Sequence, residues 1–199
     1  MQPARLKLEK MKKGKVLVLG ALIALGLSSC IKEGETFDPM AQYEIEKPII
    51  KEYVNNHYPN ATEDENSGIW YEILEEGEPG SYEYKVVNNQ IEAPTVTVKY
   101  TGKLLDGTQF DENQDEDGAE MPLSRVIQAW QIAFLPQEID GAEVNGLTVD
   151  GLQVGAKIRI ITPSIWAYRN QAQAKIPANS PLEFEIEVLN IEAPKNSGF

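Results

Sequence analysis

Apolar and polar residues alternate in five short segments of this chain, a period of two that is typical of half-buried antiparallel strands. A tight turn at Asp106-Gly107 ends one of these segments, and Pro163 ends another. The segments are GIWYEILEEG (68–77), SYEYKVV (81–87), TVTVKYTGKLLDG (95–107), GAKIRIITP (155–163) and PLEFEIEVLNIE (181–192). In the last of them Leu182, Phe184, Ile186 and Val188 are predicted to face inward, and Glu183, Glu185 and Glu187 outward.

Two further segments have helical spacing. From Gln42 to His57 an amphipathic helix is predicted, whose apolar face is formed by Ile45, Ile49, Tyr53 and Val54. A shorter helix is predicted over RVIQAWQIAFL, with Ser124 as its N-cap. Strands with few helices predict the α+β fold class.

The N-terminus has the features of an export signal. Three lysines precede an unbroken apolar run from Val16 to Leu27, which is shorter than a bilayer-spanning helix. The run ends in Leu27-Ser28-Ser29-Cys30, which resembles the box at which bacterial lipoproteins are cleaved and acylated. An ordinary signal peptide followed by a chance cysteine is the alternative. We therefore expect a signal peptide over 1–29, lipidation at Cys30, a tether over 30–41, a helical extension over 42–68 and the main domain over 69–192.

Charge and cysteine content exclude several classes of function. Cys30 is the only cysteine, so the part after it has no disulfide, no cysteine nucleophile and no cysteine metal site. Without residues 1–29, 12 basic and 30 acidic residues remain, a net charge of −18. This charge predicts no nucleic-acid partner and no attraction to anionic headgroups, so that membrane attachment would depend on acyl chains on Cys30. The lone His57 has no second histidine beside which it could form a metal site.

Four blocks of sequence, in this order, resemble the signature of the FKBP-type peptidyl-prolyl cis–trans isomerases. They are VTVKYTGKLLDGTQFD, VIQAW, GAKIRIITPSIWAY and KIPANSPLEFEIEVLNI, and together they span about 95–191. The resemblance implies a curved antiparallel sheet, a half-barrel, wrapped around a short helix. The layout of signal, tether, helix and domain is also similar to FKBP-type lipoproteins of Bacteroidetes.

The resemblance also implies a site without a cofactor or metal, at which proline-containing polypeptides bind. In it, Trp130 forms the floor of an apolar pocket, Asp111 lies at the rim, and Ile176 overhangs the opening. The Ile127 backbone N–H and the Tyr168 hydroxyl are implied to hold peptide carbonyls. The implied walls are Tyr100, Phe110, Val126, Ile127 and Phe184.

Such a pocket suits the reaction, because rotation about a prolyl bond breaks no covalent bond. The planar amide separates charge by resonance, and the twisted transition state has lost that separation. A dry apolar pocket therefore favours the twisted amide without an acid, a base or a nucleophile. The resemblance implies a membrane-anchored isomerase that assists the folding of exported proteins in the cell envelope, at the outer membrane. The alternative is an FKBP-like module that binds peptides or a partner with little turnover.

The chain departs from the family pattern at several positions. Met121 replaces an aromatic residue, and Ala129 and Arg169 replace glycines, where they are expected to crowd the backbone. After Trp130 a long insertion reaches to about Gln153, and we expect it to fold back beside the pocket and restrict entry. The acidic run that begins at Asn113 mimics a calcium loop but has Ser124 where that loop needs glutamate, so a solvated loop is expected.

Overall fold

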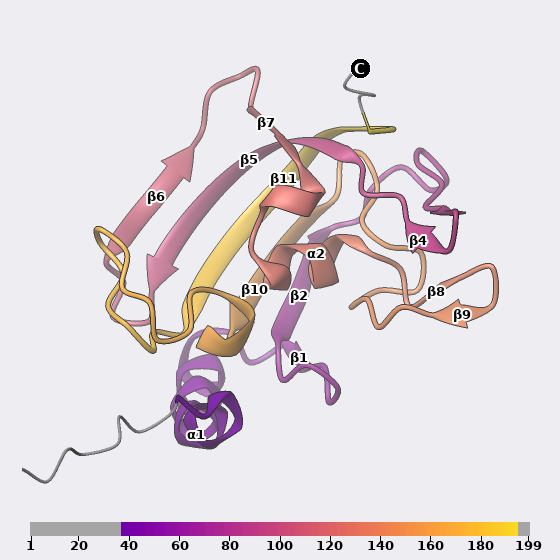
Figure 1. Ribbon diagram of the computed structural model, residues 1–199. Coiled ribbons are helices and arrows are strands. Elements are labelled where there is room, and N and C mark those ends of the chain that lie inside the picture. The colour runs from indigo at the N-terminus through magenta and orange to yellow at the C-terminus, as the bar shows by residue number, and fades with distance from the viewer. Residues whose placement is uncertain (1–36, 195–199) are drawn as a thin grey trace, which may run out of the picture. The chain divides into compact units, whose positions relative to one another are not determined.

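An antiparallel sheet of seven strands forms the frame of the protein in the computed structural model, which describes residues 37–194. The strand order is β1-β2-β10-β11-β5-β6, and β7 pairs with β5 on the same edge as β6. The sheet curves around the short helix α2 (Figure 1), which confirms the predicted α+β class with an FKBP-like arrangement. The strands are β1 (Thr62–Glu63), β2 (Trp70–Glu75), β5 (Thr95–Leu104), β6 (Gln109–Asn113), β7 (Ala119–Pro122), β10 (Lys157–Thr162) and β11 (Leu182–Glu192).

The helices and two small hairpins lie outside this sheet. In β3–β4 the turn residues Asn88 and Asn89 both have positive φ, as a two-residue hairpin turn requires. These elements are α1 (Pro39–His57), η1 (Leu123–Arg125), α2 (Gln128–Phe134), η2 (Ser164–Trp166), β3 (Val86–Val87), β4 (Gln90–Ile91), β8 (Glu138–Ile139) and β9 (Ala142–Glu143). Among residues 37–194 no helix is both long and apolar enough to cross a membrane.

Side-chain alternation places two cores on opposite faces of the sheet. Ile158 and Ile160 of β10 face the large core beneath α2. Ile161, on the other face, packs with Ile50 and Val54 of α1. Four of the five predicted strand segments are confirmed, although strand β2 is limited to 70–75.

The predicted strand at 81–87 is wrong except for its last two residues. The Tyr82 N–H donates a hydrogen bond to the side-chain oxygen of Gln153 at 2.9 Å, and the Gln153 side-chain N–H₂ donates to the Tyr82 carbonyl at 3.2 Å. The Tyr84 hydroxyl donates to the Leu152 carbonyl at 2.8 Å. These contacts supply hydrogen-bond partners to residues 81–85 without a neighbouring strand. Residues 81–85 are therefore irregular and bond to Leu152 and Gln153, which follow α2 in the chain.

Helix α1 buries only part of the face that the sequence predicts: Val54 is buried and Tyr53 packs beside it, as expected. Glu46, Ile50 and Val54 are buried, whereas Ile45 and Ile49 are 61% and 52% exposed. The helix begins at Pro39, where the Asp38 side chain accepts hydrogen bonds from the Met40 and Ala41 N–H groups. The helix is turned about its axis relative to the prediction because Glu46 accepts hydrogen bonds from Ser164, a polar contact that the apolar pattern does not reveal.

The outer face of β11 is also covered in part, which corrects the expectation for Glu183. Its side chain points away from the large core, as predicted, but α1 covers it, so it is only 5% exposed. Its carboxylate accepts hydrogen bonds from the Tyr53 hydroxyl at 2.5 Å and the Tyr58 hydroxyl at 2.8 Å. Burying a carboxylate is costly unless donors surround it, and these two hydroxyls supply them.

The insertion after Trp130 forms part of the core. Phe134, Leu147 and Leu152 are at most 2% exposed and pack in the large core, and Ile139 is also buried. None of the residues 135–153 lines the pocket described below. The expectation that this segment restricts entry to the pocket is therefore wrong, because Phe134, Leu147 and Leu152 pack in the large core instead.

Candidate functional site

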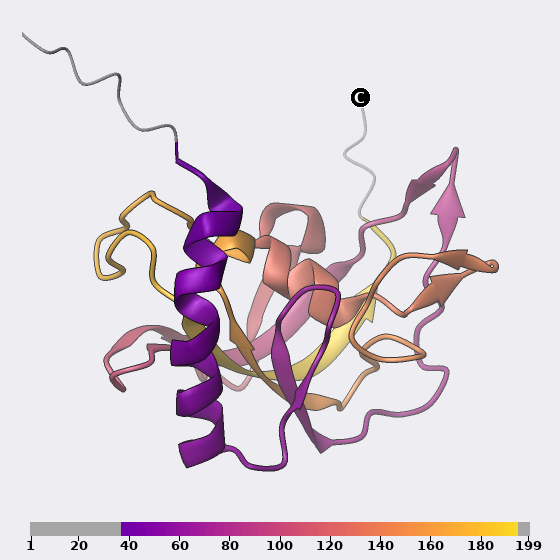
Figure 2. The ribbon, with the colours of Figure 1, turned by 90° about the horizontal axis from the view of Figure 1, so that it is seen from below.

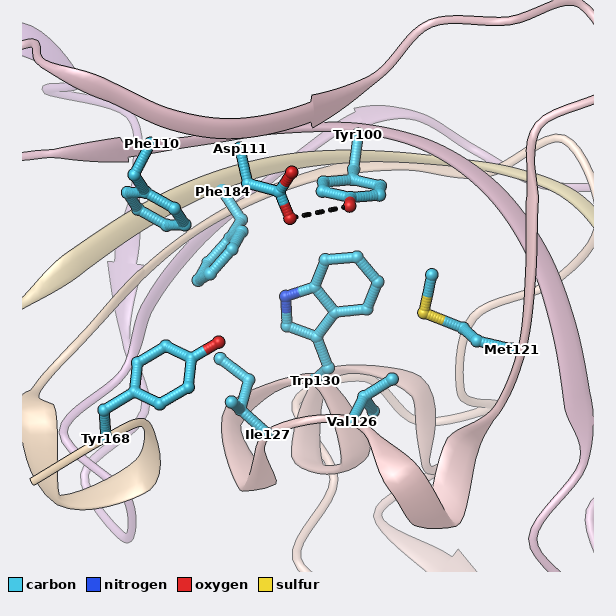
Figure 3. A pocket seen from close by; sticks show the side chains of 9 residues that line it. All are labelled: Tyr100, Phe110, Asp111, Met121, Val126, Ile127, Trp130, Tyr168 and Phe184. Atoms are coloured by element: carbon cyan, nitrogen blue, oxygen red, sulfur yellow. Dashed lines mark hydrogen bonds between the residues drawn. The ribbon is translucent and has the colours of Figure 1, made fainter. Parts of the chain in front are cut away.

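One pocket of about 120 Å³ opens between the concave face of the sheet and the N-terminal end of α2 (Figure 3). Its volume is well below the roughly 300–1,000 Å³ typical of sites for drug-sized ligands, so it suits one small side chain. The structure brings eight of the nine predicted pocket residues to it. The lining consists of Tyr100, Phe110, Asp111, Met121, Val126, Ile127, Trp130, Tyr168 and Phe184.

Edge-to-face aromatic contacts fix the walls. The ring centroids of Trp130 lie 5.2 Å from those of Tyr100 and 5.5 Å from those of Phe184, with interplanar angles of 81° and 89°. Phe110 meets Phe184 at 5.6 Å and 83°. Edge-to-face contact is a favoured arrangement of aromatic pairs, and these three contacts fix the relative positions of the four rings.

Three hydrogen-bond donors at this pocket have no partner within 37–194. The Trp130 indole N–H is buried and unbonded, and its nitrogen faces the space between Phe184 and Tyr168 (Figure 3). The Tyr168 hydroxyl points toward the same space. The Ile127 N–H lies just before the first turn of α2, which leaves it outside the helical hydrogen bonds. Unpaired donors in an apolar cavity are costly, and a ligand with carbonyl acceptors would satisfy them.

Asp111 is bonded across the rim to Tyr100. The Tyr100 hydroxyl donates to its carboxylate at 2.8 Å, and the Glu112 N–H donates to its other oxygen at 3.0 Å. Burial, followed by this hydrogen bond and the Asp111 charge, raises the pKa of Tyr100 to about 12. Burial and the same charge also raise the pKa of Tyr168. Both phenols therefore remain donors throughout the physiological pH range.

Two residues differ from the predicted site. Ile176, expected to overhang the opening, is 5% exposed and packs in the large core without lining the pocket. Met121, which the sequence marks only as a departure from an aromatic residue, lines the pocket from β7. Pairing of β7 with β5 places it there, and its position directly before Pro122-Leu123 was the available signal.

Residues 88–189, about half of the chain, match the sequence model of the FKBP-type peptidyl-prolyl cis-trans isomerases. The chain belongs to this family. It is 36% identical over 104 residues to the FKBP-type isomerase FkpA of Aeromonas hydrophila, covering 52% of this chain and 33% of that protein. It is 33% identical over 146 residues to the FKBP-type 22 kDa isomerase of Escherichia coli, covering 71% and 57%. The chain thus spans between a third and three fifths of the length of these relatives.

Solved structures of FKBP-type proteins share the fold. The crystal structure of Escherichia coli FkpA superposes with a TM-score of 0.56 at 22% identity, covering 78% of this chain and 62% of that one. A peptidyl-prolyl isomerase from Pseudomonas syringae superposes with a TM-score of 0.54 at 24% identity, covering 80% and 99%. At these identities the likeness supports the FKBP fold alone.

The two replacements of family glycines have different consequences. Ala129 is fully buried inside α2 and keeps a negative φ, so its side chain imposes no left-handed strain on the backbone there. Arg169 has a φ of 54°, a left-handed conformation that costs a non-glycine residue roughly 1–2 kcal/mol. Its N–H donates to the Ser164 carbonyl at 2.9 Å, and its carbonyl accepts from the Asn179 N–H at 2.7 Å. These two hydrogen bonds keep the Arg169 backbone in the left-handed conformation that glycine adopts easily.

Ser124 does not cap α2, contrary to prediction. It lies inside η1, and Val126, with a ψ of 169°, separates η1 from α2. The residue at the N-cap is Ile127, which makes no side-chain hydrogen bond. The Gln131 amide donates to the Val126 carbonyl at 3.0 Å and holds this junction. The break in the predicted helix leaves the Ile127 N–H free for a ligand.

Within 37–194 no three acidic, histidine or cysteine residues are arranged to hold a metal ion. In the acidic loop the Asn113 amide donates to Asp115 at 3.4 Å. His57, the only histidine, lies at the end of α1 with Nδ1 2.8 Å from the Tyr53 carbonyl, and it does not line the pocket. The expected signal peptide and Cys30 lie outside the described residues.

Proposed function

We propose that this protein is a peptidyl-prolyl cis-trans isomerase that acts on proline-containing polypeptides. The observation that supports this most is the aromatic pocket with the unbonded Ile127 N–H, Trp130 N–H and Tyr168 hydroxyl at its edge. A proline ring enters the apolar space, and the donors take the carbonyls on either side of it. The dry pocket stabilises the twisted amide, and each tenfold gain in rate needs about 1.4 kcal/mol of such preference.

Asp111 acts through Tyr100 and not as an acid or a base. Its carboxylate holds the Tyr100 ring, whose edge contact with Trp130 sets the pocket floor. No step of the rotation transfers a proton.

Tyr168→Phe tests the role of the hydroxyl. We expect kcat/KM for a proline peptide to fall about fivefold, in the range for loss of one neutral hydrogen bond to a ligand. The free energy of unfolding should change little, because the hydroxyl has no partner in the described part of the chain. A variant with wild-type kcat/KM would remove Tyr168 from the site.

The pH dependence provides a second test. We expect kcat/KM to be flat between about pH 6 and 9, because no proton moves and both pocket phenols keep their protons beyond the usual pKa of 10. A bell-shaped profile, measured with uncatalysed rates subtracted at each pH, would contradict this mechanism.

The proposal extends to location: the protein acts on exported polypeptides from an acyl anchor on Cys30 in the cell envelope, at the outer membrane. The supporting observation is the Leu27-Ser28-Ser29-Cys30 sequence after a short apolar run. We expect Cys30→Ser to move the protein from the membrane fraction to the soluble fraction, because stable anchoring needs two or more acyl chains. Retention of Cys30→Ser in the membrane fraction would contradict acylation at this residue.

A further inference from the structure

Helix α1 holds the turn from which Tyr168 reaches the pocket. Glu46 of α1 is 1% exposed, and its carboxylate accepts hydrogen bonds from the Ser164 N–H at 2.7 Å and the Ser164 hydroxyl at 2.5 Å. The Gln42 side chain donates to the same carboxylate at 2.8 Å. Figure 2 shows α1 running alongside the short η2 turn that begins at Ser164.

Ser164 in turn fixes the backbone on both sides of Tyr168. Its carbonyl accepts hydrogen bonds from the Ala167 N–H and the Arg169 N–H, each at 2.9 Å. Tyr168 lies between these two donors, so a shift of Ser164 moves the residue that carries the pocket hydroxyl. The path from Glu46 to Tyr168 is therefore short: hydrogen bonds join Glu46 to Ser164 and Ser164 to the two backbone neighbours of Tyr168.

The segment after α1 contacts the same turn at a second point. The Ser67 carbonyl accepts the Trp166 indole N–H at 2.7 Å, and Ser67 is held by the Asp64 carboxylate at 2.8 Å to its N–H. Residues 37–68 thus bond η2 at both of its ends, yet none of them lines the pocket. They also lie before residue 88, where the match to the FKBP family begins.

A buried carboxylate is a costly way to attach a helix, because apolar contacts would do so without desolvating a charge. The contacts of Ile50 and Val54 with Ile161 already attach α1 to the sheet. The Glu46 carboxylate adds a fixed orientation of Ser164, since two of its hydrogen bonds converge on that residue.

We propose that Glu46 is a positioning residue: through Ser164 it sets the place of the Tyr168 hydroxyl and so the efficiency of prolyl isomerisation. The inference rests on the proposed function for its kinetic consequence. Its structural consequence, an α1 that orders the η2 turn, can be measured separately.

The test compares Glu46→Gln with Tyr53→Phe in the whole chain. Glutamine keeps the shape but has no charge and one acceptor oxygen in place of the two that receive the bonds from Ser164 and Gln42. Tyr53→Phe removes one bond between the same helix and Glu183, away from η2. We expect Glu46→Gln to lower kcat/KM about fivefold and Tyr53→Phe to change it less than twofold. Hydrogen exchange at the 164–169 amides should accelerate in Glu46→Gln but not in Tyr53→Phe. Ser164→Ala, which removes only the hydroxyl, should show a smaller effect in the same direction and serves if Glu46→Gln does not fold.

A double variant separates positioning from general loosening. If Glu46 acts through Tyr168, adding Glu46→Gln to Tyr168→Phe should lower kcat/KM no further, and full additivity would overturn the inference. Unchanged exchange at 164–169 in Glu46→Gln would overturn it whatever the kinetics. If the wild type does not accelerate isomerisation of the proline peptide, the proposed function is contradicted. The effects of Glu46→Gln, Tyr168→Phe and the double variant are then measured on the Kd of a proline peptide, from NMR shifts.

Discussion

Replacing Leu147 by alanine is expected to lower the free energy of unfolding by about 3 kcal/mol, within the range for large-to-small core substitutions. Leu147 is 1% exposed and packs in the large core together with Phe134 and Leu152. Its N–H also donates to the Ile132 carbonyl at 3.2 Å, which fixes the backbone beside α2. Because Leu147 is fully buried, its truncation to alanine leaves a cavity in the core. Chemical denaturation of the whole chain measures the change.

Val149 is the matched control in the same segment. It lies two residues further along and is 71% exposed, so Val149→Ala should change the free energy of unfolding by less than about 0.5 kcal/mol. Equal small losses in both variants would mean that the segment after α2 is a surface loop that contributes little to the core.

Replacing Gly102 by alanine is expected to lower kcat/KM at least tenfold, about 1.4 kcal/mol of transition-state stabilisation. A Cβ on this β5 residue would lie 2.6 Å from Phe110 Cζ and 3.0 Å from Phe184 Cε1. At least one of these rings must move, which breaks the edge-to-face contact between them and reshapes the pocket wall. The isomerisation rate of a proline peptide, compared at equal fractions of folded protein, measures the effect.

Gly107→Asn is the control for a substitution of a glycine in the same hairpin. Gly107 has a φ of 87°, and a Cβ there would meet no atom within 4 Å. Asparagine tolerates positive φ better than most residues, so kcat/KM should stay within about twofold of the wild type. If Gly102→Ala also keeps wild-type kcat/KM, the ring arrangement does not determine the activity.

The sequence predicts the site better than it predicts the surroundings. Tyr100, Trp130 and Phe184 lie on elements whose alternation or helical spacing is evident, and the order of four motifs relates them to one family. Gly102 is not singled out, because its importance comes from the close approach of two rings from other strands.

Long-range polar contacts explain most of the errors. The apolar pattern of α1 favours Ile45 and Ile49, but Glu46 is turned inward by Ser164, which lies 118 residues away. Glu183 is buried by Tyr53, at a separation of 130 residues. Hydrophobic periodicity does not reveal such pairs, since Glu46, Ser164 and Glu183 each look like surface residues in the sequence.

The insertion shows a similar limit. Its turn residues and apolar residues are visible in the sequence, but the direction in which Leu147 and Leu152 point depends on packing against α2 and Tyr84. The length of the insertion and its apolar residues suggested a segment folded over the pocket, but the structure buries Phe134, Leu147 and Leu152 in the core instead.

Exchange NMR on a proline-containing peptide at equilibrium tests the central claim most directly, because it reports binding and cis–trans interconversion in one sample. At micromolar protein the account predicts that the wild type accelerates interconversion at least about tenfold over the uncatalysed rate, and that Gly102→Ala loses most of this acceleration. Peptide signals that shift on binding while the interconversion rate stays at the uncatalysed value would contradict it, and would identify the domain as a binding module.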